Sequence, residues 1–278
     1  YGVYKIDSLL GEARNAAYTA VALAPELPEA HIALAFIHQN FTFDWNAADE
    51  AYEAAIALSP QNPVPFHRYA DYLWLTLRLE RARAMAQRAI EIDPLDESSM
   101  HAVGITAMAA GDFAAAADAF GDWKHYYPGS RWSYMKHAVA LSLDGQCEDA
   151  LGEVADVDRI ANGRLSPLME AWRLWVYFNC GEGDLYATAK ERLEAQIGTD
   201  PGQSQPAHGY LYALEGDTER MIEMLQRMVE SESPGTLYVQ VYLLDYMEWP
   251  VRKTLSEDAR YLQLLRDLDF PKTEWSVN

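Results

Sequence analysis

The stretch 102-AVGITAMAAGDFAAAADAF-120 predicts two helices joined by a tight turn. Alanine-rich runs with helical periodicity stand on both sides of Gly111 and Asp112. Glycine readily takes the left-handed conformation that ends a helix, and aspartate accepts hydrogen bonds from the first free N–H groups of the next helix. We therefore expect a helical hairpin with Gly111 just after the first helix and Asp112 as the N-cap of the second. The Gly-Asp pairs at 183–184 and 216–217 predict the same turn.

The hairpin recurs with a period of about 34 residues. Four helix-forming runs end at Pro25, Pro60, Pro94 and Pro128, whose spacings are 35, 34 and 34 residues. Small residues keep the same phase: Ala13, Ala48, Ala82 and Ala116 come twelve residues before the prolines, Ala20, Ala55, Ala89 and the larger Trp123 come five before, and Ala35, Ala70, Gly104 and Ala138 come ten after. Because small side chains in phase let paired helices approach closely, these positions predict tightly packed hairpins.

This 34-residue helix-turn-helix pattern resembles the tetratricopeptide repeat. The resemblance implies an all-α, right-handed superhelical solenoid of antiparallel helix hairpins, in which the first helix of each hairpin lines the concave side. We expect about six to seven repeats, including partial ones. Regular units are predicted over 1–162, the first of them partial, two degenerate hairpins over 163–236, and a C-terminal helical cap over 237–278, all in one continuous solenoid.

Three segments carry a narrower resemblance. The pair Asp44-Trp45, the boundary 90-IEIDPLDESS-99 and the closing 249-WPVRKTLSEDARYLQLLRDLDFP-271 look like the C-terminal repeat region of bacterial winged-helix transcriptional regulators and adenylate cyclases. That family usually has a proline after the aspartate of the last segment and a phenylalanine soon after, whereas Ala259 and Tyr261 stand here. The resemblance implies an upstream effector domain, DNA-binding or nucleotide-cyclising, with the repeats as its sensory or partner-binding arm.

The amino-acid composition excludes some classes of binding partner. The 42 acidic and 22 basic residues give a net charge of −20, which repels phosphate backbones and anionic lipid surfaces. We therefore expect no direct nucleic-acid or membrane binding, and no apolar run approaches the roughly 18 residues of a membrane span. A first residue other than methionine, Tyr1, suggests a piece of a longer protein. A cytoplasmic location is predicted, with the periplasmic arm of a membrane-tethered regulator as the alternative, and homodimerisation stays open.

Signatures of chemistry are missing from the sequence. The motifs G-x-x-x-x-G-K-[ST], H-E-x-x-H and G-x-S-x-G do not occur, so we expect neither catalysis nor a cofactor. Cys147 and Cys180 lie 33 residues apart with no cysteine near either, which predicts buried thiols rather than a disulfide framework or a zinc site. His67 and His101 occupy equivalent places on adjacent first helices and could share a metal, but without a third ligand a polar groove lining is favoured.

The concave groove is the predicted site of function. Projection of the repeat onto the first helices places the following residues there: Phe36, Gln39, Asn40, His67, Asp71, Trp74, His101, Ile105, Met108, Trp132 and Met135. They lack the recurring Lys and Arg with which repeat domains of this kind clamp acidic chaperone tails, which disfavours that class of partner. Aromatic residues and methionines suit an apolar or aromatic peptide or helix instead. For any one of them, the alternative is a place in the interhelical core.

Together these observations predict a non-enzymatic protein–protein interaction scaffold, the regulatory or sensory arm of a larger bacterial signalling or transcription protein. The alternative is a small-ligand sensor whose superhelix closes around a metabolite near the C-terminal units, where Trp172, Trp175, Tyr177 and Tyr210 concentrate aromatic surface. A third hypothesis is a structural module that only dimerises its parent.

Overall fold

The computed structural model describes residues 6–198, 206–230 and 250–270, and within these ranges every regular element is helical. The helices are α1 (Ile6–Leu23); the hairpins α2 (Pro28–Ile37) with α3 (Trp45–Leu58), α4 (Pro63–Leu75) with α5 (Leu79–Ile92), α6 (Glu97–Ala109) with α7 (Phe113–Tyr126), α8 (Arg131–Leu143) with α9 (Cys147–Ala161), α10 (Pro167–Asn179) with α11 (Gly183–Ile197) and α12 (Pro206–Glu215) with α13 (Thr218–Glu230); and finally α15 (Arg252–Glu257) and α16 (Ala259–Asp267). The predicted all-α solenoid of hairpins is confirmed.

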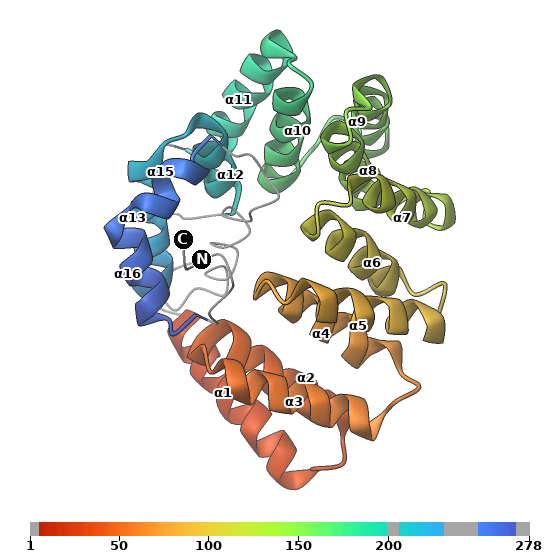
Figure 1. The fold of residues 1–278 in the computed structure, drawn as a ribbon, viewed down its shortest axis with the longest axis vertical. Helices are drawn as coiled ribbons and strands as arrows, with labels where there is room; N and C mark the ends of the chain where they lie inside the picture. The colour runs from red at the N-terminus through yellow and green to blue at the C-terminus, as the bar shows by residue number, and fades with distance from the viewer. Residues whose placement is uncertain (1–5, 199–205, 231–249, 271–278) are drawn as a thin grey trace.

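The hairpins follow one another around a curve that is almost a closed ring (Figure 1). The first helices α4, α6, α8, α10 and α12 face its middle, and α7, α9 and α11 lie outside them. On the inner side α4 packs on α6, α8 packs on α10, and α10 packs on α12. Helices α6 and α8 are splayed apart by comparison, with α7 packed against both of them. The curve returns the C-terminal end of α16 to the N-terminal helices, whereas α15 packs on α13 (Figure 1).

Two of the three Gly-Asp pairs that were predicted to form turns between helices do so. Gly111 has a φ of 74°, and the Asp112 carboxylate accepts a hydrogen bond from the backbone N–H of Ala115 at 3.3 Å. Gly216 has a φ of 69°, and Asp217 caps α13 in the same way. Both are turns in which glycine ends one helix and aspartate begins the next, as predicted.

The prediction for the pair 183–184 is wrong by two residues. Gly181 takes the left-handed conformation, with a φ of 71°, and Glu182 is the N-cap of α11. Gly183 and Asp184 already belong to the first turn of that helix. The reason is that Gly181 is the first residue after α10 that can adopt a positive φ without strain, so the chain turns there before it reaches the Gly-Asp pair.

The small residues in phase form the contacts between helices. Those without solvent exposure are Ala35, Ala48, Ala55, Ala70, Ala82, Ala89, Ala116 and Ala138. Gly104 is under the tightest constraint, because a Cβ added there would lie 2.2 Å from Cε1 of the fully buried Phe120. In the first unit Ala13 is exposed and Ala20 half-buried, since no hairpin precedes α1 in the described chain to cover them.

One extra residue between Pro25 and Pro60 has a visible structural effect. That spacing is 35 residues where the later ones are 34. Helix α2 continues into a π-helical turn over His38–Thr42, and Phe43 follows in the left-handed conformation with a φ of 52°. A π-turn holds one more residue than an α-turn, so it absorbs the insertion without breaking the hairpin.

The prediction of buried thiols is wrong. Cys147, at the start of α9, and Cys180, the residue that caps the end of α10, form a disulfide with a Cα–Cα distance of 5.5 Å, and both are half-buried. Their separation of 33 residues is one residue short of a repeat period, but they sit at opposite ends of their helices: one begins a second helix and the other ends the next first helix. Stacking of the two hairpins therefore places them side by side.

Two further predictions concern the whole chain. The division at 162–163 falls in the loop between α9 and α10, where Asn162 has a φ of 50°, but the distinction between regular and degenerate units stays a prediction. The segment 237–249 at the start of the predicted cap lies outside the described residues. Among the described helices none is both long and apolar enough to span a membrane.

Candidate functional site

The first three predicted groove residues do not share one environment. Phe36, on α2, is 46% exposed. Gln39 is buried in the hairpin and accepts a hydrogen bond from the hydroxyl of Tyr52 at 2.8 Å. Asn40 is also buried, and its Nδ2 donates to the carbonyl of Phe36 at 2.9 Å. Both amides lie in the π-turn, where the added residue rotates side chains away from the register that a 34-residue projection assumes.

The remaining predicted residues come from α4, α6 and α8. Asp71, His101 and Trp132 are half-buried and keep part of their surface in solvent. The others are buried: His67, Trp74, Ile105, Met108 and Met135. The apolar members of this group belong to the core that runs through the solenoid, so much of their area is already covered by neighbouring helices.

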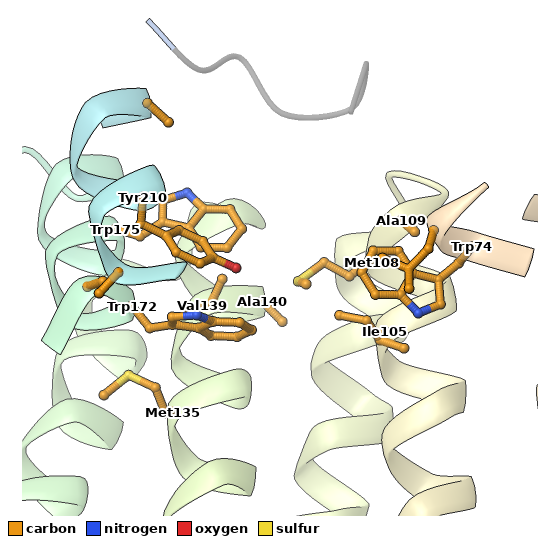
Figure 2. Close-up of a cluster of buried hydrophobic side chains, with 14 of the residues drawn as sticks. Trp74, Ile105, Met108, Ala109, Met135, Val139, Ala140, Trp172, Trp175 and Tyr210 are labelled. Carbon is orange, nitrogen blue, oxygen red and sulfur yellow. The ribbon is translucent and has the colours of Figure 1, made fainter. Parts of the chain in front are cut away.

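Two aromatic groups occur among the buried side chains of the first helices. Figure 2 shows Trp74 with Ile105 and Met108 in one group, and Trp172 with Trp175 and Tyr210 in the other, with Ala140 between them in this view. Trp132 joins the second group through an edge contact with Trp172, at 6.3 Å between ring centroids. Helices α6 and α8 lie between the two groups, and both groups belong to one continuous hydrophobic core.

Lys136 lies on the face of Trp172, in the second group, and was missed by the sequence analysis. It stands on α8, is only 9% exposed, and its Nζ lies 4.3 Å from the ring centroid of Trp172 and 6.0 Å from that of Phe120. No hydrogen bond or ion pair of its ammonium group is formed within the described chain. A signal was available: one period earlier stands Ala102, which is completely buried, so a lysine at this phase is unusual.

Asp71, on α4, is the acidic counterpart of Lys136. Burial raises the pKa of Asp71 to about 6, although the cations of Arg68 and Lys136 act to lower it. Its Oδ1 is buried without a hydrogen-bond partner. The indole N–H of Trp74 is near enough to lower this pKa slightly, but the two groups do not reach hydrogen-bond geometry. The carboxyl group is therefore poised to lose its proton near neutrality.

Burial acts on Lys136 in the opposite sense. It lowers the pKa of the ammonium group to about 7, and the negative charge of Asp71 raises it in part. Both groups thus titrate close to neutral pH. Burial disfavours the charged form of each group, and the opposite charge of the other group compensates for this only in part. Perturbed pairs of this kind gather at functional sites more often than elsewhere.

The two histidines are held neutral. Burial lowers the pKa of His67 to about 4, and the Asp96 carboxylate, 4.0 Å from its Nε2, only partly opposes this. Burial, and then the positive charge of Lys136, lower the pKa of His101 far below its usual value. The ring of His101 packs edge-on against Trp123 at 5.7 Å. No group of three metal-ligating side chains occurs in the described part of the chain.

Two indole N–H groups on the inner side have no acceptor. Nε1 of Trp74 and Nε1 of Trp172 are both buried without a hydrogen-bond partner. With Lys136 they make three donors, from α4, α8 and α10, that no protein group satisfies. An unsatisfied buried donor costs about 1–3 kcal/mol, so groups of them usually mark a place where a ligand or water completes the bonding.

The C-terminal aromatic residues fill space rather than enclosing it. Trp172, Trp175 and Tyr210 contact one another with ring centroids 5.8–6.0 Å apart (Figure 2), and Tyr177 of the same helix as the tryptophans is also buried. A separate, open hollow of about 810 Å³ lies near these units. It is lined by Phe178, Tyr186, Leu214, Glu215, Gly216, Asp217, Thr218, Glu219 and Arg220.

Comparison with known proteins supports the fold. No family model and no curated protein matches the sequence. Among solved structures, PilF of Pseudomonas aeruginosa is similar over 71% of this chain and 88% of its own, with 18% identity and a TM-score of 0.54. PilW, a type IV pilus biogenesis factor, is similar over 71% of this chain and 90% of its own, with 18% identity and a TM-score of 0.59. YrrB, a TPR protein, reaches a TM-score of 0.42 at 19% identity, over 69% of this chain and 97% of its own. At these identities the likeness concerns the fold alone, and the all-α solenoid of helical hairpins is confirmed.

Proposed function

We propose that the protein is a non-enzymatic protein–protein interaction scaffold that binds an apolar or aromatic peptide or helix along the inner side of its ring. One observation carries this proposal: α6 and α8 are splayed apart, and aromatic and apolar side chains flank the splayed region on both sides (Figure 2). Solenoids commonly bind partners on such extended concave surfaces.

The accessible part of the lining supports an apolar contact. Phe36 and Trp132 expose aromatic surface, and Trp74, although buried, has an indole N–H without an acceptor. Large aromatic residues in partly enclosed places are the side chains that dominate binding energy in most interfaces. The net charge of −20 then serves solubility, and contributes little to binding.

The test begins with selection of a random peptide library on the immobilised protein, followed by affinity measurements on an enriched peptide. Trp74→Ala should weaken binding by about 2 kcal/mol or more. Tyr126→Ala is the control, because Tyr126 is 54% exposed at the end of the outer helix α7. Melting curves of both variants show whether the fold is intact.

Salt separates this surface from an electrostatic one. At 1 M salt the screening length is about 3 Å, so apolar binding should weaken little while attraction of a basic partner to acidic faces collapses. A steep loss of affinity with salt, together with an unaffected Trp74→Ala variant, would place the binding surface on the other side of the solenoid.

The wider context is proposed to be a bacterial signalling or transcription protein of which this chain is the regulatory arm. The support is the resemblance of the three segments noted above, two of which touch: the indole of Trp45 donates a hydrogen bond to the carbonyl of Leu268. The reading frame around this chain tests the idea. A winged helix or a cyclase encoded in the same frame supports it, and an unrelated enzyme domain contradicts it.

The Cys147–Cys180 disulfide favours the periplasmic location over the cytoplasmic one, because structural disulfides persist in oxidising compartments and are rare in the cytosol. Alkylation of free thiols in intact cells tests this directly. Protection of both cysteines is expected, and free labelling of both would favour the cytoplasm.

A small-ligand sensor is the second candidate, supported by the hollow of about 810 Å³ beside α12 and α13. Its lining is polar and includes Glu215, Asp217 and Arg220. A thermal-shift screen against a panel of metabolites distinguishes the two functions. A reproducible rise in melting temperature that is lost in Arg220→Ala would favour the sensor, whereas enriched peptides favour the scaffold.

A further inference from the structure

Lys136 is the only lysine among the described residues that is nine-tenths buried. No anionic group of the described chain lies within hydrogen-bonding distance of it. Its ammonium group rests on the face of Trp172, and its only charged counterpart, Asp71, forms no ion pair with it. A buried cation is costly unless it is paired or hydrogen-bonded. The protein therefore holds an unpaired cation inside an otherwise aromatic and apolar lining.

The indole N–H groups without an acceptor also favour a ligand that accepts hydrogen bonds. Nε1 of Trp172 and Nε1 of Trp74 are N–H groups that can only donate, and neither has an acceptor. Lys136 likewise can only donate. The ammonium group of Lys136 rests on the ring of Trp172, so these donors and one positive charge lie close together and select an acceptor that carries negative charge. A carboxylate meets this description, and charge-assisted hydrogen bonds to it are the stronger kind.

We propose that the inner side of the ring recognises a single acidic side chain, Glu or Asp, within an apolar or aromatic peptide or helix, and that Lys136 receives its carboxylate. This inference rests on the proposed function and deepens it. The carboxylate is internal to the partner rather than its C-terminus, because apolar side chains occur on both sides of α8: Trp74 and Met108 on one, Trp172 on the other (Figure 2).

The same peptide selection tests the inference. Peptides enriched on the wild-type protein should share one acidic position flanked by aliphatic or aromatic residues. Selection on Lys136→Met, which keeps the apolar stem and removes the charge, should enrich apolar peptides without that position. For an enriched peptide, replacement of its Glu by Gln should weaken binding to the wild type about tenfold or more, and should change binding to Lys136→Met little.

Two further variants separate recognition from a structural role. Trp172→Phe keeps a ring beneath the ammonium group and removes the indole N–H, so it should lower the preference for Glu over Gln without abolishing binding. Lys136→Arg keeps the charge and should retain the preference. Melting curves and circular dichroism verify that each variant is folded, and the Glu-to-Gln comparison on the wild-type protein needs no variant at all.

The pH response gives a readout that a structural lysine would not. Since the pKa of Lys136 is about 7, affinity for the Glu peptide should fall as the pH rises from 6 to 9. Asp71 acts in the same direction over the lower part of this range, because it gains negative charge near pH 6, while His67 and His101 stay neutral. In Lys136→Arg the fall above pH 7 should disappear.

The outcomes distinguish the two proposals. Enriched peptides without an acidic position, or with one that Lys136→Met retains, would overturn the carboxylate inference and leave the interaction scaffold standing. Failure to enrich any peptide would overturn both.

Discussion

Trp45 and Leu268 lie 223 residues apart in sequence, and the indole Nε1 of Trp45 donates a 3.0 Å hydrogen bond to the carbonyl of Leu268. The ring of Phe270 packs against the same indole at 4.9 Å. Trp45 begins α3, and Leu268 caps α16, so this contact joins the first hairpin to the C-terminal end of the described chain. It closes the ring that the curvature of the hairpins brings near completion (Figure 1).

We expect the ring to open when this contact is weakened. Trp45→Phe removes the N–H, and Phe270→Ala removes the ring contact, while α16 stays attached to α13 through the two hydrogen bonds from Arg260 to Glu219. The double variant should therefore remain folded and show a larger radius of gyration in X-ray scattering. Tyr126→Ala, remote from the closure, should scatter like the wild type. Unchanged scattering by the double variant would mean that other contacts close the ring.

Gly104→Ala should destabilise the protein by about 1–3 kcal/mol through overpacking. The added Cβ would lie 2.2 Å from an atom of Phe120, and that ring is fully buried and cannot move aside. The matched control is Gly152→Ala in α9, where a Cβ meets nothing within 4 Å. Because alanine favours a helix interior, the control should gain about 0.5–1 kcal/mol. Urea denaturation compares them, and equal effects would show that the α6–α7 interface is looser than described.

Loss of the Cys147–Cys180 disulfide should lower stability by about 2–4 kcal/mol, since it closes a loop of 33 residues in the unfolded chain. Melting temperatures with and without reductant measure this. The Cys147→Ala/Cys180→Ala variant should melt near the reduced wild type, and reductant should not change its melting temperature. A wild type that melts identically in both conditions would indicate that the bond contributes nothing to stability.

Asp71→Asn should stabilise the protein at pH 8 by about 1–3 kcal/mol. The pKa of Asp71 is about 6 in the folded protein and near 4 when unfolded, so the folded state binds more protons between these values and wild-type stability falls as pH rises through them. The advantage of Asn should therefore be complete above pH 6.5 and nearly absent at pH 4. Urea denaturation across this range tests it, and a difference that does not depend on pH would contradict the raised pKa.

The sequence by itself determined the repeat. Proline spacing, alanine phase and the Gly111–Asp112 junction specify local events, because a helix ends and begins according to residues within a few positions of the turn. Tight hairpins follow from the same local phase, which is why nearly all the in-phase alanines of the later units are buried. The all-α solenoid could be predicted for this reason without any knowledge of long-range contacts.

The position of a residue within the repeat did not predict its place in the structure where one residue was added, or where a turn had two candidate glycines. The π-turn moved Gln39 and Asn40 into the hairpin, because an insertion shifts every side chain after it by about one helical step. The 35-residue spacing was the available signal, but it does not say where the extra residue is accommodated.

Only the tertiary structure decided which distant residues meet. The Cys147–Cys180 bond, the contact of Trp45 with Leu268 and the position of Lys136 on the face of Trp172 all depend on how hairpins stack and how far the solenoid curves. Those angles are sums of many small side-chain contacts between helices, and no short stretch of sequence contains them. The repeat could therefore be predicted from the sequence, whereas the closure of the ring and the position of the Lys136 ammonium group depend on how the helices pack.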